Sequence, residues 1–190
     1  MEWKRFPVPE FDYKALRGLT YEPPSLISAT EAQAIATAAA TVDASVAGGY
    51  AVEPDPSLLD RFNVRGEHAK LVLCALPRPD GHLLGRSRAW FNQRAFVLDG
   101  NTADAAVLYE WRTLRTFNTC LGPEDGVTLN RAAIWILSGR ILGDHTRANR
   151  VMIDSIWTPD GDRKGFRVIA ASDAEPNEFH DSCFELTWPS

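Results

Sequence analysis

Apolar residues recur along the chain in two patterns. A repeat of three to four residues predicts helices, and a repeat of two residues predicts strands. The first helical segment is rich in alanine and is predicted over 29–47. Ser28 and Glu31 have the spacing of a capping box at its start, and Gly48-Gly49 provides a stop at its end. A shorter helix is expected at Ser57–Phe62.

Extended segments are predicted where apolar and polar residues alternate, or where short apolar runs lie between turn residues. The expected strands are Ala69–Leu76, Leu83–Phe91, Arg94–Leu98, Val151–Trp157, Gly165–Ala171 and Cys183–Trp188. Pro79-Asp80-Gly81 and Pro159-Asp160-Gly161 are turn sequences, so a hairpin is expected around each. Both hairpins carry the string Pro-Asp-Gly-x-x-x-Gly, which reflects either a duplication or a common solution to the same turn.

A second long helix is predicted over 102–121. Asn101 is a suitable N-cap, and Gly122-Pro123 ends the segment. Its apolar residues form one arc of a helical wheel: Ala103, Ala106, Val107, Trp111, Leu114, Phe117 and Leu121. Glu110 and Asn118 lie inside the same arc, so we expect both to face the core.

The segment 129–142 fits either type of element. Its run Ala132–Leu137 is apolar on every side, which indicates burial in both cases. Asn130 as a cap and Gly143 as a stop favour a helix. Helices are thus mixed with antiparallel hairpins, without regular β-α-β alternation. This pattern predicts the α+β class, with an antiparallel sheet of hairpins and two or three helices packed on one face.

Composition and charge narrow the function classes. The chain has 190 residues, 45% of them hydrophobic, and no stretch approaches the roughly 20 apolar residues of a membrane span. A net charge of −5 gives no electrostatic footprint for nucleic acid. Three widely spaced cysteines and the lack of a signal peptide predict a reduced, cytoplasmic protein, with Cys74 and Cys120 in or near the core.

The first 24 residues differ from the rest of the chain. Prolines at four positions prevent a continuous helix. Between them lie large apolar side chains that need a surface to pack on: Trp3, Phe6, Phe11, Tyr13, Leu16, Leu19 and Tyr21. We expect 1–24 to be an extended arm and 25–190 to be a single α+β domain. The arm lies either over its own domain or on a neighbouring subunit.

The sequence contains no P-loop, dinucleotide fingerprint, H-E-x-x-H, paired C-x-x-C or G-x-S-x-G motif. Candidate site residues are therefore polar residues at positions predicted to face the core. Glu110 is the first, because a carboxylate facing a core is costly unless it is paired or protonated. It is either an acid–base group or the partner of an arginine. Trp111 and Asn118, beside it on the predicted helix, are the expected ligand contacts.

Either Asp154 or His145 is the expected catalytic partner of Glu110. Asp154 either shares a cavity with Glu110 or lies on the solvent side of its strand. A further hypothesis places a metal at His145, His180, Asp181 and Cys183. A single His-x-x-Cys pair is a weak metal signal, so no metal or other cofactor is expected.

Two functions follow from these observations. The first is a non-catalytic binding or assembly protein that self-associates, or joins a protein partner, through its amino-terminal arm. The alternative is a small hydrolase, hydratase or isomerase with an acid–base carboxylate in a cavity between helix and sheet. A small-molecule ligand is compatible with both, whereas nucleic acid and membrane are not expected as partners.

Overall fold

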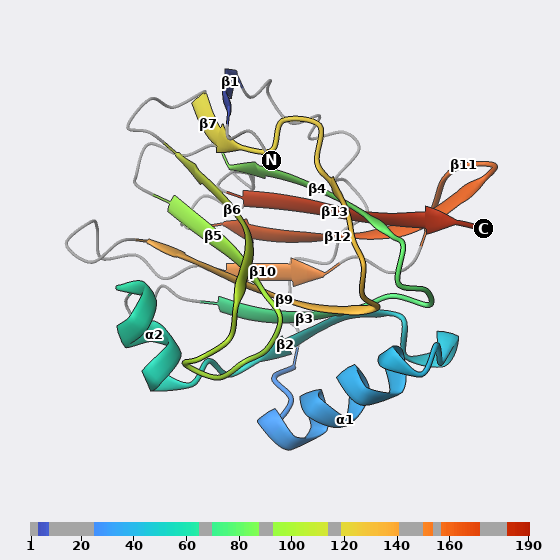
Figure 1. Cartoon of the computed structure of the whole chain (residues 1–190), viewed down its shortest axis with the longest axis horizontal. Coiled ribbons are helices and arrows are strands. Elements are labelled where there is room, and N and C mark those ends of the chain that lie inside the picture. The colour runs from blue at the N-terminus through green and yellow to red at the C-terminus, as the bar shows by residue number, and fades with distance from the viewer. Residues whose placement is uncertain are drawn as a thin grey trace.

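The protein consists mainly of antiparallel strands arranged in two sheets (Figure 1). The computed structural model describes residues 4–7, 25–64, 70–87, 93–113, 119–140, 150–153, 157–171 and 182–190. In spatial order, the seven-stranded sheet contains β1 (Lys4–Pro7), β7 (Thr119–Gly122), β6 (Val107–Thr113), β5 (Gln93–Leu98), β9 (Ala133–Arg140), β3 (Lys70–Ala75) and β2 (Gly48–Val52). The six-stranded sheet contains β10 (Arg150–Ile153), β12 (Arg163–Ala171), β13 (Ser182–Pro189), β4 (His82–Ser87) and β8 (Val127–Thr128), with β11 (Trp157–Asp160) paired to β12. The helices are α1 (Ala29–Ala40) and α2 (Pro56–Phe62), and a 3-10 turn covers Ala44–Val46.

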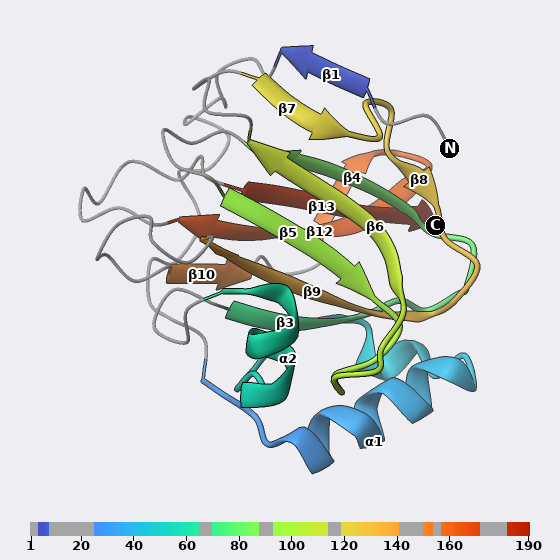
Figure 2. The same cartoon turned by 60° about the vertical axis from the view of Figure 1, so that its left-hand side comes forward.

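Apolar side chains fill the space between the two sheets, and we call them the inter-sheet layer. The seven-stranded sheet contributes Val72, Cys74, Ala95, Val97, Trp111, Cys120, Ile134 and Ile136. The six-stranded sheet contributes Leu83, Phe166, Val168, Phe184, Leu186 and Trp188. Burying each large side chain of this kind stabilises the fold by roughly 1.5–3 kcal/mol. The layer therefore holds together the two sheets, whose strands Figure 2 shows one behind the other.

A second apolar cluster lies on the opposite face of the seven-stranded sheet. The helices contribute Ala32 and Ala36 from α1 and Leu58 and Phe62 from α2. The strands contribute Val52, Leu71, Leu73, Phe96, Leu98, Trp135 and Leu137. Strands β3 and β9 are thus buried on both faces.

The start of α1 is predicted correctly and its end is not. The Ser28 side chain accepts a hydrogen bond from the Glu31 backbone N–H at 3.1 Å, as the capping spacing indicates. The helix ends at Ala40, earlier than predicted. Val42 leaves the helix with a φ of 62° and is exposed, and Gly48-Gly49 begins β2 instead of stopping the helix. The short helix predicted at Ser57–Phe62 is confirmed as α2.

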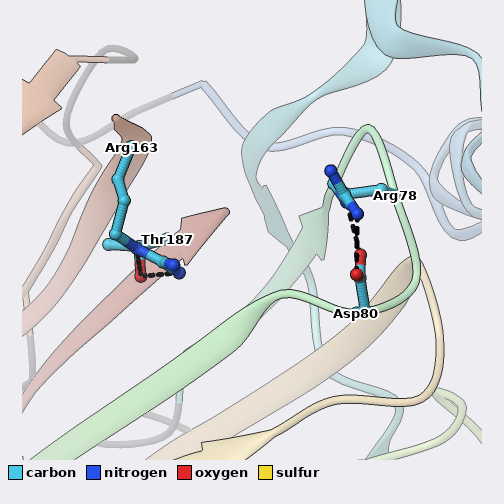
Figure 3. A network of polar contacts seen from close by, with 4 residues as sticks. All are labelled: Arg78, Asp80, Arg163 and Thr187. Carbon is cyan, nitrogen blue, oxygen red and sulfur yellow. Dashed lines mark hydrogen bonds and ion pairs between the residues drawn. The ribbon is translucent and has the colours of Figure 1, made fainter. Parts of the chain in front are cut away.

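The turn Pro79-Asp80-Gly81 joins the two sheets instead of closing a hairpin. β3, which precedes it, belongs to the seven-stranded sheet, and β4, which follows it, to the six-stranded sheet. An ion pair between Arg78 and Asp80 braces the turn, with Nη2 donating to Oδ2 at 2.7 Å (Figure 3). The predicted pairing of these two strands is therefore wrong. The other copy of the string does lie in a hairpin, because β11 and β12 pair in antiparallel register.

The helix predicted over 102–121 is also wrong. This part of the chain contains β6 and β7, which pair with each other through Arg112–Leu121 and Thr113–Cys120. Side chains of β6 alternate between the inter-sheet layer and the opposite face, as Trp111 and Glu110 show. The apolar residues of β6 fit both helical and extended spacing. Pairing with β5 and β7 stabilises the extended form.

The helix favoured over 129–142 is likewise a strand, β9. Ile134 and Ile136 face the inter-sheet layer, while Trp135 and Leu137 lie in the cluster with the helices. A strand between two apolar layers is apolar on both faces, which is why its sequence resembles that of a buried helix.

The predicted class is confirmed in its coarse form: across the described residues antiparallel sheet dominates, and two α-helices accompany it. The division into two sheets is not foreseen from the sequence. In the described ranges, neither helix is long and apolar enough to cross a membrane.

Candidate functional site at the polar end of the inter-sheet layer

One end of the inter-sheet layer is polar. Six strands begin or finish there, and each has a polar residue at an inward position near that end: Lys70, Ser87, Gln93, Thr113, Ser138 and Ser182. We call these six residues the polar end. All except the half-buried Lys70 are buried. On each strand, the adjacent inward residue towards the middle of the layer is apolar or glycine. The layer therefore changes from apolar to polar between two successive inward positions on all six strands.

Gln93 lies at the centre of the hydrogen bonds on the seven-stranded side. Its backbone N–H donates to Thr113 Oγ1 at 2.9 Å, and its side-chain Nε2 donates to Ser138 Oγ at 3.1 Å. The side chain is fully buried, at 0% exposed. Its Oε1 accepts no hydrogen bond from any atom that the structure describes. Leaving such an acceptor unpaired costs about 1–3 kcal/mol.

The polar residues of the two sheets are connected through Cys120. Ser87 Oγ and Ser182 Oγ lie 3.3 Å apart on the six-stranded side. The backbone of Ser87 hydrogen-bonds the Cys120 sulfur, and Cys120 stands opposite Thr113 in the register of β6 and β7. A continuous band of polar groups therefore crosses from one sheet to the other.

The groups in this band suit hydrogen bonding better than bond-breaking chemistry. Burial raises the pKa of Cys120 to about 11, although the backbone of Ser87 and the charge of Arg86 oppose the shift. Its thiol is therefore protonated at neutral pH and is a poor nucleophile. The hydroxyl and amide groups of the band do not titrate near neutral pH, and Lys70 supplies one cation at the half-buried edge.

Glu110 and Trp111 do not line one cavity, because consecutive residues of a strand point to opposite faces. Glu110 Oε1 accepts from Arg94 Nε at 2.7 Å and lies 2.6 Å from Arg94 Nη2. The ion pair with an arginine, one of the two readings from the sequence, is thus present. Trp111 is fully buried in the inter-sheet layer, and its Nε1 donates to the Pro123 carbonyl oxygen at 3.2 Å.

The other candidate residues from the sequence are mostly outside the described ranges. These are Asn118, His145, Asp154, His180 and Asp181, and their proposed roles stay predictions. Cys183 is described, as a half-buried residue of β13. Within the described ranges, no three His, Cys, Asp or Glu side chains are grouped as a metal site would require.

The described part of the amino-terminal arm belongs to its own sheet. β1 pairs with β7, and Phe6 is 3% exposed within the inter-sheet layer. The Arg86 guanidinium lies 5.1 Å from the centre of the Phe6 ring. Residues 1–3 and 8–24 of the arm are outside the described ranges.

Sequence reasoning missed the polar end. Each of its residues stands at the margin of an apolar run, where a polar residue usually marks the passage into a loop. Only the topology shows that six such margins meet at one end of the same layer. Comparisons of the chain with known protein families, curated proteins and solved structures found no match.

Proposed function

We propose that this protein is a non-catalytic binding protein that holds a small hydrogen-bonding ligand at its polar end. The observation that carries the proposal is the unpaired, buried Gln93 Oε1 among the described residues. Buried polar groups are nearly always hydrogen-bonded, so an unpaired one calls for a partner that the fold itself does not provide. A ligand N–H or O–H would supply it.

The neighbouring groups indicate the class of ligand. Hydroxyls at Ser138 and Thr113 donate or accept, and the Lys70 ammonium donates only. A matching molecule has at least one donor for Gln93 and one acceptor for Lys70, as a small amide or hydroxy acid does. A few polar groups beside a mainly apolar layer are typical of small-molecule sites. We keep a cytoplasmic location as part of the proposal, because none of the three cysteines, all in the described ranges, forms a disulfide.

The enzymatic alternative has less support. It needs Glu110 beside a ligand contact at Trp111, whereas the two side chains lie on opposite faces of β6. Glu110 is also engaged by Arg94. We therefore favour binding without catalysis at the polar end.

A thermal-shift screen of small amides, alcohols and hydroxy acids tests the proposal. Compounds that stabilise the wild-type protein should bind Gln93→Met at least about tenfold more weakly, because one buried hydrogen bond is lost. Thr187→Val is the matched control: Thr187 is also buried, but it lies towards the far end of β13, where its Oγ1 accepts from Arg163 Nη2 at 2.9 Å (Figure 3). Failure of every compound, or equal binding by Gln93→Met, would contradict the proposal.

A further inference from the structure

The outer face of the seven-stranded sheet, turned away from the six-stranded sheet, has two unlike halves. One half lies in the apolar cluster with the helices, which takes strand residues from β2, β3, β5 and β9. Among the described residues, none from β1, β6 or β7 belongs to that cluster. Figures 1 and 2 both show the helices at the end of the molecule away from β1 and β7.

Three arginines cross the second half of this face in a single row. Arg94, Arg112, Leu121 and Arg5 stand opposite one another on β5, β6, β7 and β1. Their strand neighbours face the inter-sheet layer, which places the four side chains on the outer face: Ala95, Trp111, Cys120 and Phe6. We call Arg5, Arg94 and Arg112 the arginine row. At about 4.8 Å between strands, it is about 14 Å long.

Among the described residues, the arginine row is only partly neutralised. Glu110 pairs with Arg94. Arg5 and Arg112 form no ion pair in the described structure, and Arg112 is half-buried. Arg94 and Arg112 stand directly opposite each other, and like charges in that position destabilise a sheet. The row therefore favours an acidic partner.

The helical half of the protein carries the opposite charge. Residues 25–64 contain a single base, Arg61, whose Nη1 donates to the Ala103 carbonyl oxygen at 2.6 Å. They contain five acids, all exposed: Glu31, Asp43, Glu53, Asp55 and Asp60. None of the five forms an ion pair in the part of the chain that the structure describes. The excess of acidic side chains thus lies in the helical half, away from the strands that carry the arginine row.

We infer that the partner of the arginine row is a second copy of this chain. A two-fold axis parallel to the outer face, running between its two halves, would place the acidic helical segment of each copy on the arginine row of the other. Both contacts would then be identical, and the pair would close as a dimer without further growth. Charge complementarity of this kind specifies partner and orientation. This interface goes beyond ligand binding at the polar end and does not depend on it.

Sedimentation velocity of the full-length protein tests the dimer. At about 50 mM salt we expect twice the monomer mass, and at about 500 mM salt a dissociation constant at least about tenfold higher, because exposed charges are screened. Arg5→Glu/Arg112→Glu should be monomeric at low salt. Lys164→Glu, which reverses an exposed charge on β12 of the other sheet, should remain dimeric.

A charge swap distinguishes loss of the dimer by charge repulsion from loss of the dimer by unfolding. Glu31→Lys/Asp60→Lys should also be monomeric, and combining it with Arg5→Glu/Arg112→Glu should restore the dimer. Circular dichroism confirms that each variant is folded. A wild-type monomer at about 100 μM in low salt would overturn the inference. So would a dimer indifferent to the arginine variants, or assemblies that continue to grow with concentration.

Discussion

The two ends of the inter-sheet layer are built on the same strands and differ in the side chains that they turn inward. Towards one end lie large apolar groups, where the rings of Phe166 and Trp188 meet edge to face with centroids 6.1 Å apart. At the other end lie hydroxyls, an amide and a thiol, with one buried acceptor left unpaired among the described residues. The comparison indicates that the apolar part supplies most of the free energy of folding. The side chains of the polar end are then less constrained by stability and can serve ligand binding.

Phe184→Ala and Ser182→Ala make the sharpest test, because the two residues are successive inward positions on β13. Phe184 is fully buried, with its ring 6.0 Å from that of Trp111. Its truncation should lower the free energy of unfolding by about 3–5 kcal/mol. Ser182→Ala removes one long hydroxyl contact and should cost about 1 kcal/mol or less. Denaturant unfolding measures both, and equal losses would show that the two ends contribute alike.

Gly85→Ala probes the packing around Trp111. A Cβ at Gly85 would lie 2.4–2.8 Å from three atoms of the indole ring, which is closer than packing allows. We expect a loss of about 2–3 kcal/mol. Gly161→Ala is the control, because nothing lies within 4 Å of a Cβ at that position. An indole free to move aside would instead make the two variants equally stable.

The pH dependence of stability reports on the buried thiol near the polar end. Burial raises the pKa of Cys120 in the folded state to about 11, from an ordinary value of 9.0. Below about pH 9 the thiol is protonated in both states, and the folded state keeps its full stability. As the pH rises towards 11, stability is lost, because the Cys120 thiol ionises in the unfolded chain before it ionises in the folded one. The loss should be on the order of 2 kcal/mol. Cys120→Ala should reduce this decline in unfolding experiments, and an unchanged decline would assign it to other groups.

Gln93→Met should leave stability nearly unchanged. The substitution removes a buried acceptor that has no partner among the described atoms, and the methionine fills a similar volume. It also removes the hydrogen bond that Nε2 donates to Ser138 Oγ, which costs a similar amount. We therefore expect a net change of no more than about 1 kcal/mol in the absence of ligand. Calorimetry of the ligand-free protein measures it. A clear loss of stability would mean that Gln93 serves the fold rather than a ligand.

Glu110→Gln should have the smallest effect, because this residue lies outside the layer. Its ion pair with Arg94 joins side chains that are 19% and 25% exposed. Exposed pairs contribute about 0.2–1 kcal/mol, and this partly buried pair should stay close to that range. Denaturant unfolding against Arg131→Gln, whose contact with Asp99 is longer at 3.9 Å, provides the comparison. A loss as large as that of Phe184→Ala would place a main stabilising contact outside the inter-sheet layer.

The sequence alone was sufficient for features set by neighbouring residues. The Ser28–Glu31 cap, the short helix α2 and the turn residues at 79–81 depend on interactions a few residues apart. The positions of β3, β5, β12 and β13 also followed from local apolar runs. The burial of Cys74 and Cys120 was foreseen for the same reason.

Tertiary structure alone decided which strands pair and which side chains meet. Glu110 appeared to face a core because helical spacing fitted its segment, yet β5 and β7 hold that segment extended and place Glu110 beside Arg94. Strand β9 resembled a helix because two apolar layers bury both its faces. The polar end required six strand ends to meet across two sheets. Strand pairing joins residues far apart in the chain, and local sequence patterns do not encode those contacts.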